Sequence, residues 1–372
     1  MPPKAPKRAR ASSAEPVDGG APSAPKAGAG AGAGASTAGA ADVPAAKKGG
    51  KPKLPPSAHE GPADFEPMDK ALCAPAATWA AFTASLPPPL APAAACAPGC
   101  GKILSVNVNG MRALLSKVGA DLQGWLAAEG ASVLVLQEVK ADVAAVAKAG
   151  LDKAFPALPH ARFACSGPPA KKGYSGVAIF SAHAPLAWHE GVGVPGIDAE
   201  GRVLAAEFEH HFIVVVYVPN SGQKLDRLAW RTEVFDPAFA AYLQKLQARK
   251  PVVVLGDFNV AYHNFDVADP KAYRNKIAGF CDAERDNWQR LLLGAAPAGA
   301  GLVDAWREAN PARQLFTYYS IMRKGRESGR GWRIDGSLVS PALMPRVRDA
   351  FVRGTLPSAA GLDHLPVGLT LV

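Results

Sequence analysis

The sequence predicts an α/β protein in which two mixed β-sheets pack face to face with helices outside them, a four-layered α/β sandwich. Three observations predict it. Short β-branched runs alternate with amphipathic stretches from Lys102 to the C-terminus. Two of these runs flank a short polar link and read as a hairpin, which argues against a purely parallel sheet. Hydrophobic residues make up 48% of the 372-residue chain, enough for a sizeable core.

The first 60 residues differ from the rest in composition. They are rich in Ala, Pro, Gly and Lys, and no aromatic residue precedes Phe65. Nine Lys and Arg against four Asp and Glu give this segment a charge of +5, out of +9 for the whole chain. Such a segment buries too little apolar surface to offset its chain entropy. We therefore expect a disordered basic tail over residues 1–60, a linker with little structure over 61–100, and a catalytic domain over 101–372.

The run from Lys4 to Arg10 is a basic cluster of the kind that importins bind, which favours the nucleus. A tail that only grips nucleic acid would look the same. Sparse acidic residues also fit a transit peptide to the chloroplast or mitochondrion.

The elements follow in order along the chain. One short helix is expected near Trp79. The expected strands are Ile103–Val106, Val133–Leu136, Val177–Phe180, Val203–Phe208, Phe212–Val218, Val252–Leu255, Ile334–Val339 and Val367–Leu371. The expected helices are Asp121–Glu129, Lys224–Phe235 and Asp282–Leu293. We expect Asp282 to be an N-cap, and Asp236 to cap a further helical segment with Pro237 at its first position.

Composition also excludes some classes of protein. The five cysteines are an odd, scattered set with no secretory signal, which indicates reduced thiols. Cys96 and Cys100 have ligand-like spacing, but no second pair follows nearby, so plain thiols are the better interpretation than zinc. No apolar run approaches ~20 residues, so we expect no membrane-spanning helix. No internal sequence repeat is visible. We also expect the protein to be a monomer.

Polar residues cluster where the predicted strands end. Because side chains alternate along a strand, residues two apart are expected on one side. The groups are Asn107-Val108-Asn109, Glu138-Val139-Lys140, Tyr217-Val218-Pro219-Asn220, Asp257-Phe258-Asn259, Trp332-Arg333-Ile334-Asp335 and Asp363-His364. Each group alone also fits a turn or a solvated rim. Six of them at strand ends indicate one site.

This set of residues suits phosphodiester cleavage by water. A cation is needed to neutralise charge on phosphate oxygens, and Mg²⁺ (or Mn²⁺ in its place) takes hard oxygen ligands. Glu138 is the leading ligand, followed by Asn109 and Asp363; Asp257, Asn259 and His364 complete the candidate metal set. Asp257 and His364 are the candidates for the base, and Asp335 could hold one tautomer of the imidazole. Asn107, Asn259 and Tyr217 could contact phosphate oxygens.

At these residues the sequence resembles the exonuclease III class of apurinic/apyrimidinic (AP) endonucleases, within the DNase I-like endonuclease/exonuclease/phosphatase superfamily. The resemblance runs from Lys102 to Val372. Its more specific motifs are Gly173-Tyr174-Ser175-Gly176-Val177 and Trp332-Arg333-Ile334-Asp335. It implies a DNase I-like fold and a Mg²⁺-dependent DNA repair enzyme that cuts duplex DNA 5′ to an abasic site, leaving a 3′-hydroxyl and a 5′-deoxyribose phosphate. It allows accompanying 3′–5′ exonuclease or 3′-phosphodiesterase activity.

The resemblance also implies roles for single residues. Tyr217, Asp257, Asn259, Asp335 and His364 match catalytic positions, and Glu138 matches the metal ligand. The DNA-contacting positions are matched by Arg112, Lys140, Gly173, Tyr174, Asn220, Gln223, Tyr318, Met322, Trp332 and Ile334. The chain departs from the family pattern at Asn109 (often Asp), Gln223 (an inserting Arg in some members), Ile277 (commonly Asn, for which Asn275 could substitute), Gly336 and Leu362.

Two other functions stay open at this point. One is a different phosphodiesterase of the superfamily, such as an RNA 3′ exonuclease or a phosphoinositide phosphatase. The other is a catalytically weak DNA-binding scaffold, against which the complete set of polar residues argues.

Overall fold

A computed structural model of the chain describes residues 59–68, 75–87, 96–354, 357 and 361–372. The tail predicted for residues 1–60 lies outside these ranges except for its last two residues, and so does part of the predicted linker. The basic cluster Lys4–Arg10 and Cys73 also lie outside them.

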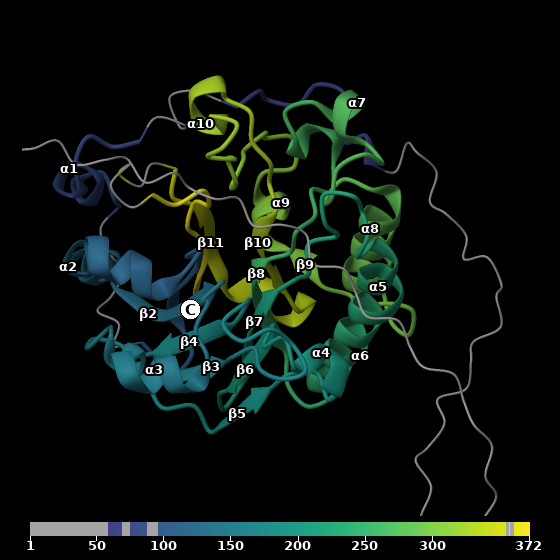
Figure 1. The fold of residues 1–372 in the computed structure, drawn as a ribbon. Helices are drawn as coiled ribbons and strands as arrows, with labels where there is room; N and C mark the ends of the chain where they lie inside the picture. The colour runs from purple at the N-terminus through teal and green to yellow at the C-terminus, as the bar shows by residue number, and fades with distance from the viewer. Residues whose placement is uncertain (1–58, 69–74, 88–95, 355–356, 358–360) are drawn as a thin grey trace, which may run out of the picture. The chain divides into compact units, whose positions relative to one another are not determined.

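Two six-stranded sheets form the centre of the domain (Figure 1). The first has the order β11-β12-β1-β2-β4-β3 and the second β5-β6-β7-β8-β10-β9. Each sheet has one parallel pair, β1 with β2 and β7 with β8, among antiparallel pairs, so both are mixed as predicted. The strands are β1 Gly101–Asn107, β2 Ala131–Gln137, β3 His160–Ala164, β4 Val177–Ser181, β5 Ala187–Glu190, β6 Val203–Glu207, β7 Phe212–Tyr217, β8 Val252–Asp257, β9 Val303–Asp304, β10 Asp335–Val339, β11 Val347–Val352 and β12 Val367–Leu371.

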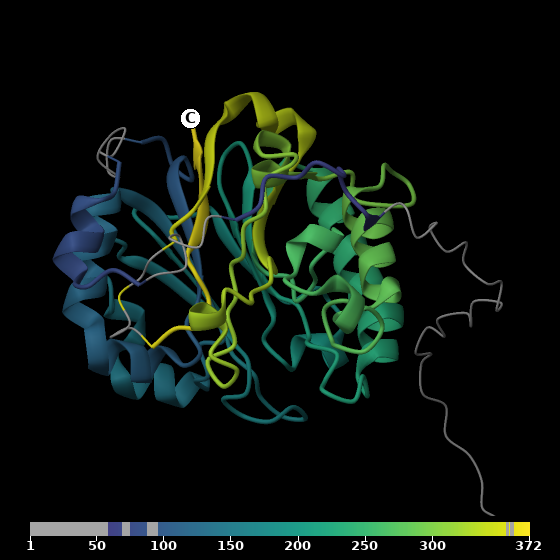
Figure 2. The same cartoon turned by 90° about the horizontal axis from the view of Figure 1, so that it is seen from above.

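Helices cover the outer face of each sheet, so the domain has four layers (Figure 2). The α-helices are α1 Trp79–Ala84, α2 Met111–Glu129, α3 Val143–Ala149, α4 Pro195–Asp198, α5 Leu228–Trp230, α6 Asp236–Gln247, α7 Pro270–Tyr273, α8 Asp282–Asn287, α9 Ala305–Ala309 and α10 Gly325–Ser328. Short 3₁₀ turns are η4 Leu151–Lys153, η6 Asn264–Asp266 and η8 Pro341–Arg346, and π-helical turns are η5 Arg231–Phe235 and η7 Trp288–Leu293.

Alternation along the strands explains this layering. In β1, Ile103 joins the cluster between the two sheets, while Leu104 and Val106 join the cluster under α2. In β8, Val253 faces the other sheet and Val254 packs with residues of α6. Because both faces of each sheet are covered, the central strands read as continuous apolar runs. The predicted fold class is therefore confirmed.

Several predicted helix boundaries are wrong. Helix α2 begins at Met111, ten residues before the predicted Asp121, and the helical stretch predicted from Lys224 begins at Leu228. Asp282 is not an N-cap: Cys281 occupies that position, and Glu284 closes the capping box. Asp236 caps no new helix, because a π-helical turn carries the chain from α5 through η5 into α6. The N-cap of α6 is Phe235, and the half-buried Asp236 side chain accepts instead from Asn287 Nδ2 at 3.0 Å.

The described part of the predicted linker contains ordered contacts. The short helix expected near Trp79 is α1. Upstream of it, Glu66 pairs with Arg313 as an isolated β-bridge, and Phe65 stacks on Phe265 with centroids 5.3 Å apart. His59 is buried, and its Nε2 lies 2.9 Å from Asp286 Oδ1. Residues 59–68 thus pack against the globular domain.

The polar segments after the strands leave the strand conformation at once. Asn109, Glu138, Lys140 and Asn259 all have left-handed φ angles between 45° and 53°. Strand alternation therefore does not continue to the second polar residue: Asn107 is fully buried, while Asn109 is exposed. The alternation from which we predicted a shared side for residues 107 and 109 ends at Asn107, the last residue of β1, and side-chain contacts connect the polar groups instead.

Candidate active site

A cleft of about 730 Å³ opens where β2, β7, β8 and β10 end. It collects twelve of the predicted site residues from six separate segments of the chain. They are Glu138, Tyr217, Asn220, Gln223, Asp257, Asn259, Tyr318, Met322, Trp332, Ile334, Asp363 and His364. The expected convergence of the strand-end groups is therefore observed.

A buried acid–histidine pair lies at the bottom of the cleft. His364 Nδ1 lies 2.9 Å from Asp335 Oδ2, and the same oxygen accepts from Thr317 Oγ1 at 2.7 Å. Isolated bridges of Tyr318 with His364 and with Trp332 fix this strand end. The carboxylate is thus held from two sides, and it fixes the imidazole so that Nε2 faces the cleft.

Across the cleft floor, His364 Nε2 lies 3.9 Å from Asp257 Oδ2. Burial opposes charge on His364, but the carboxylates of Asp335, Asp257 and Asp363 outweigh burial and raise its pKa to about 10. Burial and the neighbouring Asp335 raise the pKa of Asp257 above its ordinary range, against the opposing effect of His364. The geometry therefore places a cationic imidazole beside a carboxylate with raised proton affinity.

Asn107 joins Asp257 to the metal-ligand candidate Glu138. Its Nδ2 donates to Glu138 Oε1 and to Asp257 Oδ2, each at 3.0 Å. Because both oxygens share one donor, they lie at most about 6 Å apart, close enough for both to face one bound ion or phosphate.

The donor set around Glu138 fits a hard divalent cation. Lys140 Nζ lies 2.8 Å from Glu138 Oε2 and 2.5 Å from Asn109 Oδ1, so a positive charge already bridges the two oxygens. Asp363 Oδ1 is buried and has no hydrogen-bond partner among the described residues. Carboxylate and amide oxygens are the ligands that Mg²⁺ takes, and an orphaned carboxylate oxygen suits an ion. Asp257, Asp335 and His364 form a second group whose ligand atoms lie within 4.8 Å of one another.

Asn259 is oriented by a chain of amide hydrogen bonds. Its Nδ2 donates to Val218 O at 2.8 Å, and its Oδ1 accepts from Asn220 Nδ2 at 2.9 Å. Its backbone N–H donates to Asp257 Oδ1 at 2.8 Å. The side chains of Asn220 and Asn259 and the Asp257 carboxylate thus form one connected network on the cleft wall.

Tyr217 lies at the end of β7 with its ring against a buried arginine. The Arg202 guanidinium carbon is 4.7 Å from the Tyr217 ring centroid and 5.6 Å from that of Tyr174. Burial and the nearby carboxylates of Glu138 and Asp257 raise the pKa of Tyr217 well above its usual value. The phenol is therefore neutral at physiological pH and can donate a hydrogen bond.

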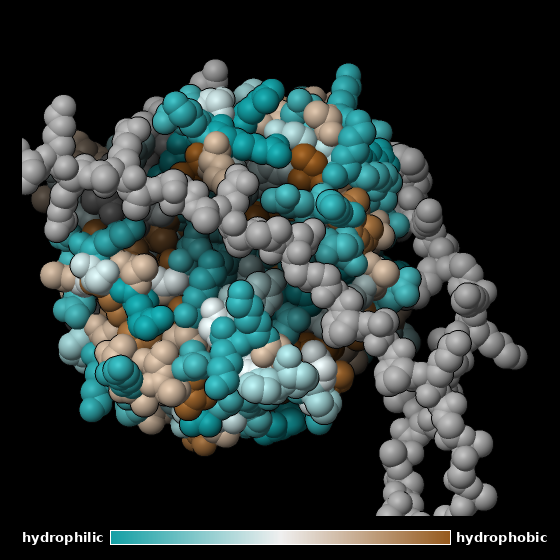
Figure 3. Space-filling view, in the orientation of Figure 1, coloured by the Kyte–Doolittle hydropathy of each residue, from teal (hydrophilic) through white to brown (hydrophobic). Residues whose placement is uncertain are grey.

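An apolar wall stands beside the polar floor. Trp332 stacks on Tyr273 with centroids 4.9 Å apart and an interplanar angle of 11°, and Ile334 is buried next to it. Tyr318 lies against His364, with centroids 4.8 Å apart. Met322, which matches a DNA-contacting position, is 90% exposed at the rim. Cations at the rim are Lys276, Arg323 and Arg330, and hydrophilic residues gather around α7 and α10 (Figure 3).

Some predicted residues lie outside the cleft lining. Asn107 and Asp335 lie behind it, and Asn109 and Lys140 reach it through Glu138. The structure places Arg112 in the first turn of α2 and Gly173 and Tyr174 in the loop before β4, and none of the three lines the cleft.

Three further residues near the site differ from the sequence predictions. The suggested substitute Asn275 does not line the cleft, because its amide bonds to both the side chain and the backbone of Asp282. Thr317 and Tyr273 were missed; neither belongs to a polar group after a strand, so no sequence signal marked them.

None of the described helices combines the length and the apolar composition that a membrane span requires.

Sequence comparisons with known proteins identify a family of nucleases and phosphatases. Residues 104–358 match the model of the "Endonuclease/Exonuclease/phosphatase family". The chain is 40% identical to "DNA repair nuclease APEX1" of Danio rerio over 278 residues, 73% of this chain and 82% of that protein. It is 36% identical to an "Exodeoxyribonuclease" of Bacillus subtilis, covering 73% of this chain and 99% of that protein.

Solved structures of nucleases also match the fold of this chain. The "3'-5' exonuclease (NExo) from Neisseria Meningitidis" matches with a TM-score of 0.60 at 30% identity, over 73% of this chain and 99% of that chain. The "AP endonuclease LMAP from Leishmania major" matches with a TM-score of 0.60 at 26% identity, over 81% of this chain and 97% of that chain.

Proposed function

The chain belongs to the endonuclease/exonuclease/phosphatase family, among its AP endonucleases and exonuclease III proteins, and we propose that it hydrolyses the phosphodiester on the 5′ side of an abasic site in duplex DNA. The products would be a 3′-hydroxyl and a 5′-deoxyribose phosphate. The observation that carries the proposal is the buried array of Asp257, His364 and Asp335 beside an apolar wall in one cleft.

The polar floor supplies the groups that hydrolysis by water requires. Asp257 accepts the proton of the attacking water, since its raised pKa suits a general base. The imidazolium of His364, fixed by Asp335, donates from Nε2 to a phosphate oxygen. Asn259 and the neutral phenol of Tyr217 donate further hydrogen bonds to the phosphate or the leaving oxygen.

Glu138, Asn109 and Asp363 would hold Mg²⁺, which when bound neutralises charge developing on the phosphate oxygens. In the structure Lys140 spans two of these residues. Lys140 therefore balances the carboxylate charge of the site and can turn its ammonium to a DNA phosphate.

The apolar wall supports the choice of substrate. An abasic nucleotide has lost its base stacking, so extruding it from the duplex costs less than extruding an intact one. A sugar without a base can lie against Trp332, Tyr318 and Ile334, with Met322 exposed at the rim to enter the groove. The rim cations would meet phosphates on either side.

Cleavage at 3′ ends by the same site is a second activity that we propose. The relatives include proteins named for exonuclease activity, and one matching structure is a "3' phosphatase NExo" from Neisseria, described as "bound to product DNA hairpin". The test compares an abasic duplex, an intact duplex with a recessed 3′ end, an RNA 3′ end and a phosphoinositide headgroup, each with Mg²⁺ and with EDTA. Product ends are identified by mass.

Fastest Mg²⁺-dependent turnover on the abasic duplex, with the stated ends, supports the proposal. Faster turnover of RNA or of the headgroup would refute it, and so would DNA binding without hydrolysis. Monomeric state and nuclear location are likewise proposals, to be tested by sedimentation and by imaging the tagged full chain beside a form that lacks residues 1–58.

A further inference from the structure

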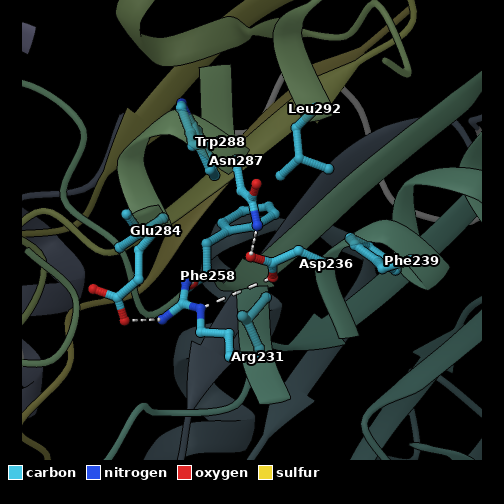
Figure 4. A pocket seen from close by; sticks show the side chains of 10 residues that line it. Arg231, Asp236, Phe239, Phe258, Glu284, Asn287, Trp288 and Leu292 are labelled. Atoms are coloured by element: carbon cyan, nitrogen blue, oxygen red, sulfur yellow. Dashed lines mark hydrogen bonds and ion pairs between the residues drawn. The ribbon is translucent and has the colours of Figure 1, made fainter. Parts of the chain in front are cut away.

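A buried ion pair lies beneath the cleft wall. Arg231 of η5 and Glu284 of α8 are 3.0 Å apart, with side-chain exposures of 2% and 0% (Figure 4). Neither side chain lines the cleft. They line instead a separate pocket of about 10 Å³ with the half-buried Asp236 and the buried residues Asn287 and Trp288.

Every described hydrogen bond of the Glu284 carboxylate goes to Arg231 or to a segment beside the cleft. Its Oε1 accepts from Ser221 Oγ at 2.5 Å, and Ser221 directly follows the cleft residue Asn220. Its Oε2 accepts from the backbone N–H groups of Gly279 at 2.8 Å and Cys281 at 2.9 Å. Gly279 lies in the cleft lining. One carboxylate thus ties two cleft segments together.

Arg231 adds the third segment. Its Nη1 donates to the carbonyl of Asn259 at 2.6 Å, and its Nη2 donates to the carbonyl of Phe258 at 2.8 Å. Asn259 has a left-handed φ of 48°, a conformation that needs support in a non-glycine residue. The guanidinium supplies that support through the carbonyls of Phe258 and Asn259, from outside the cleft lining.

A buried ion pair of this kind contributes little net stability. Removing two charges from water costs several kcal/mol per ion, and an apolar replacement is often as stable. What this pair provides is fixed positions for three segments that have no regular structure to align them. Because the Asn259 side chain accepts from Asn220 and its N–H donates to Asp257, a displacement of its carbonyl would reach both.

We propose that Arg231 and Glu284 are positioning residues for phosphodiester hydrolysis, setting the separation of Asn220, Asn259 and Gly279 across the cleft. The inference rests on the proposed function for the reaction it serves. Since neither residue touches the substrate or the ion site, loss of the pair should lower kcat and leave DNA affinity unchanged.

The test uses Glu284→Gln in the full chain. Glutamine has one acceptor oxygen, so its NH₂ must face either the Arg231 and Ser221 donors or the two backbone N–H groups. The matched control is Glu129→Gln. Glu129 is also fully buried, 2.7 Å from Lys102 and bonded to Arg353. Lys102 lies near the start of β1, whereas Asn107, which bonds to the cleft residues Glu138 and Asp257, lies at the other end of the strand.

Both variants should lose thermal stability, and only Glu284→Gln should lose turnover. We expect its kcat to fall about tenfold or more with KM nearly unchanged, and hydrogen exchange to rise at residues 258–260 and 279–281. Glu129→Gln should keep kcat and the hydrogen exchange of these two segments at wild-type levels. Arg231→Lys should act like Glu284→Gln, because one ammonium cannot reach both carbonyls and the carboxylate.

Equal kcat in the two glutamine variants, at a temperature where both are folded, would overturn the inference, and so would unchanged exchange in the two segments. Failure of the proposed function gives a different result. If the wild type leaves abasic duplex intact and trims 3′ ends, the same comparison of kcat is made on 3′ ends.

Discussion

Replacing Asp335 by Asn tests the arrangement at the cleft floor. The carboxylate accepts from His364 Nδ1 at 2.9 Å and from Thr317 Oγ1 at 2.7 Å, and it is the largest of the contributions that raise the pKa of His364 to about 10. An amide that turns its NH₂ toward the ring would force Nδ1 to accept, which leaves a neutral imidazole with its proton on Nε2. The variant should therefore lose the cationic donor and keep the shape of the site.

The structure sets the size of this effect. One hydrogen bond to a charged group contributes roughly 1.5–3 kcal/mol, which corresponds to about 10- to 150-fold in rate. Loss of the correct tautomer adds to it, and the equivalent change in a serine protease triad costs about 10⁴. We expect the single-turnover incision rate to fall by between ~10² and ~10⁴, with DNA affinity in EDTA unchanged.

Thr317→Val provides a graded comparison. It removes one neutral hydroxyl from the same carboxylate, so the rate should fall about fivefold; it also takes an acceptor from the backbone N–H groups of Ile334 and Asp335, so thermal stability should fall too. Quenched-flow incision of a labelled abasic duplex measures both rates, and a melting curve shows that each variant is folded. An Asp335→Asn rate within threefold of wild type would show that the pair does not act in catalysis.

Four further predictions concern other parts of the chain. Asp257→Asn or His364→Asn should each lower turnover by orders of magnitude with little change in DNA affinity; near-normal rates in both would refute their assigned roles. Asn109→Asp adds a carboxylate to the proposed metal site, so half-maximal activity should need less Mg²⁺, and a Mg²⁺ titration that shows no shift would count against Asn109 as a ligand. Burial raises the pKa of Asp236 to about 6. Ionisation of its carboxyl group therefore does not affect stability below its unfolded pKa of about 4, and it destabilises the folded protein by at most about 3 kcal/mol above pH 6. Asp236→Asn should accordingly gain stability relative to wild type as pH rises from 4 to 7 in urea unfolding, and a pH-independent difference would contradict the shift. Removing residues 1–58 should weaken salt-sensitive DNA binding and leave single-turnover cleavage unchanged. If the truncated chain cannot cut DNA, the predicted domain boundary is wrong.

The central strands could be predicted from sequence because both faces of each sheet are covered. Runs such as Val252–Leu255 have no polar residue to interrupt them. The edge strands β3, β5 and β11 were missed for the opposite reason. Their residues are half exposed and mixed in character, as in His160–Ala164, and only pairing with a neighbouring strand makes them strands.

The candidate site was predictable as a set of residues but not as a geometry. Asn107, Glu138 and Asp257 could be identified because polar residues directly follow apolar strands. Their connection could not, since it runs through one amide nitrogen between residues 150 positions apart. The hydrogen bond between Thr317 and Asp335 likewise depends on tertiary packing, and no local sequence pattern predicts it.

The most direct test of the account is a crystal of the full chain soaked in Mn²⁺, with anomalous diffraction used to locate the ion. The account predicts a peak at direct coordination distance, roughly 2.0–2.2 Å, from a Glu138 oxygen, with the Lys140 ammonium moved away from it. Ions found only at other surfaces, with Lys140 still bridging Glu138 and Asn109, would contradict it.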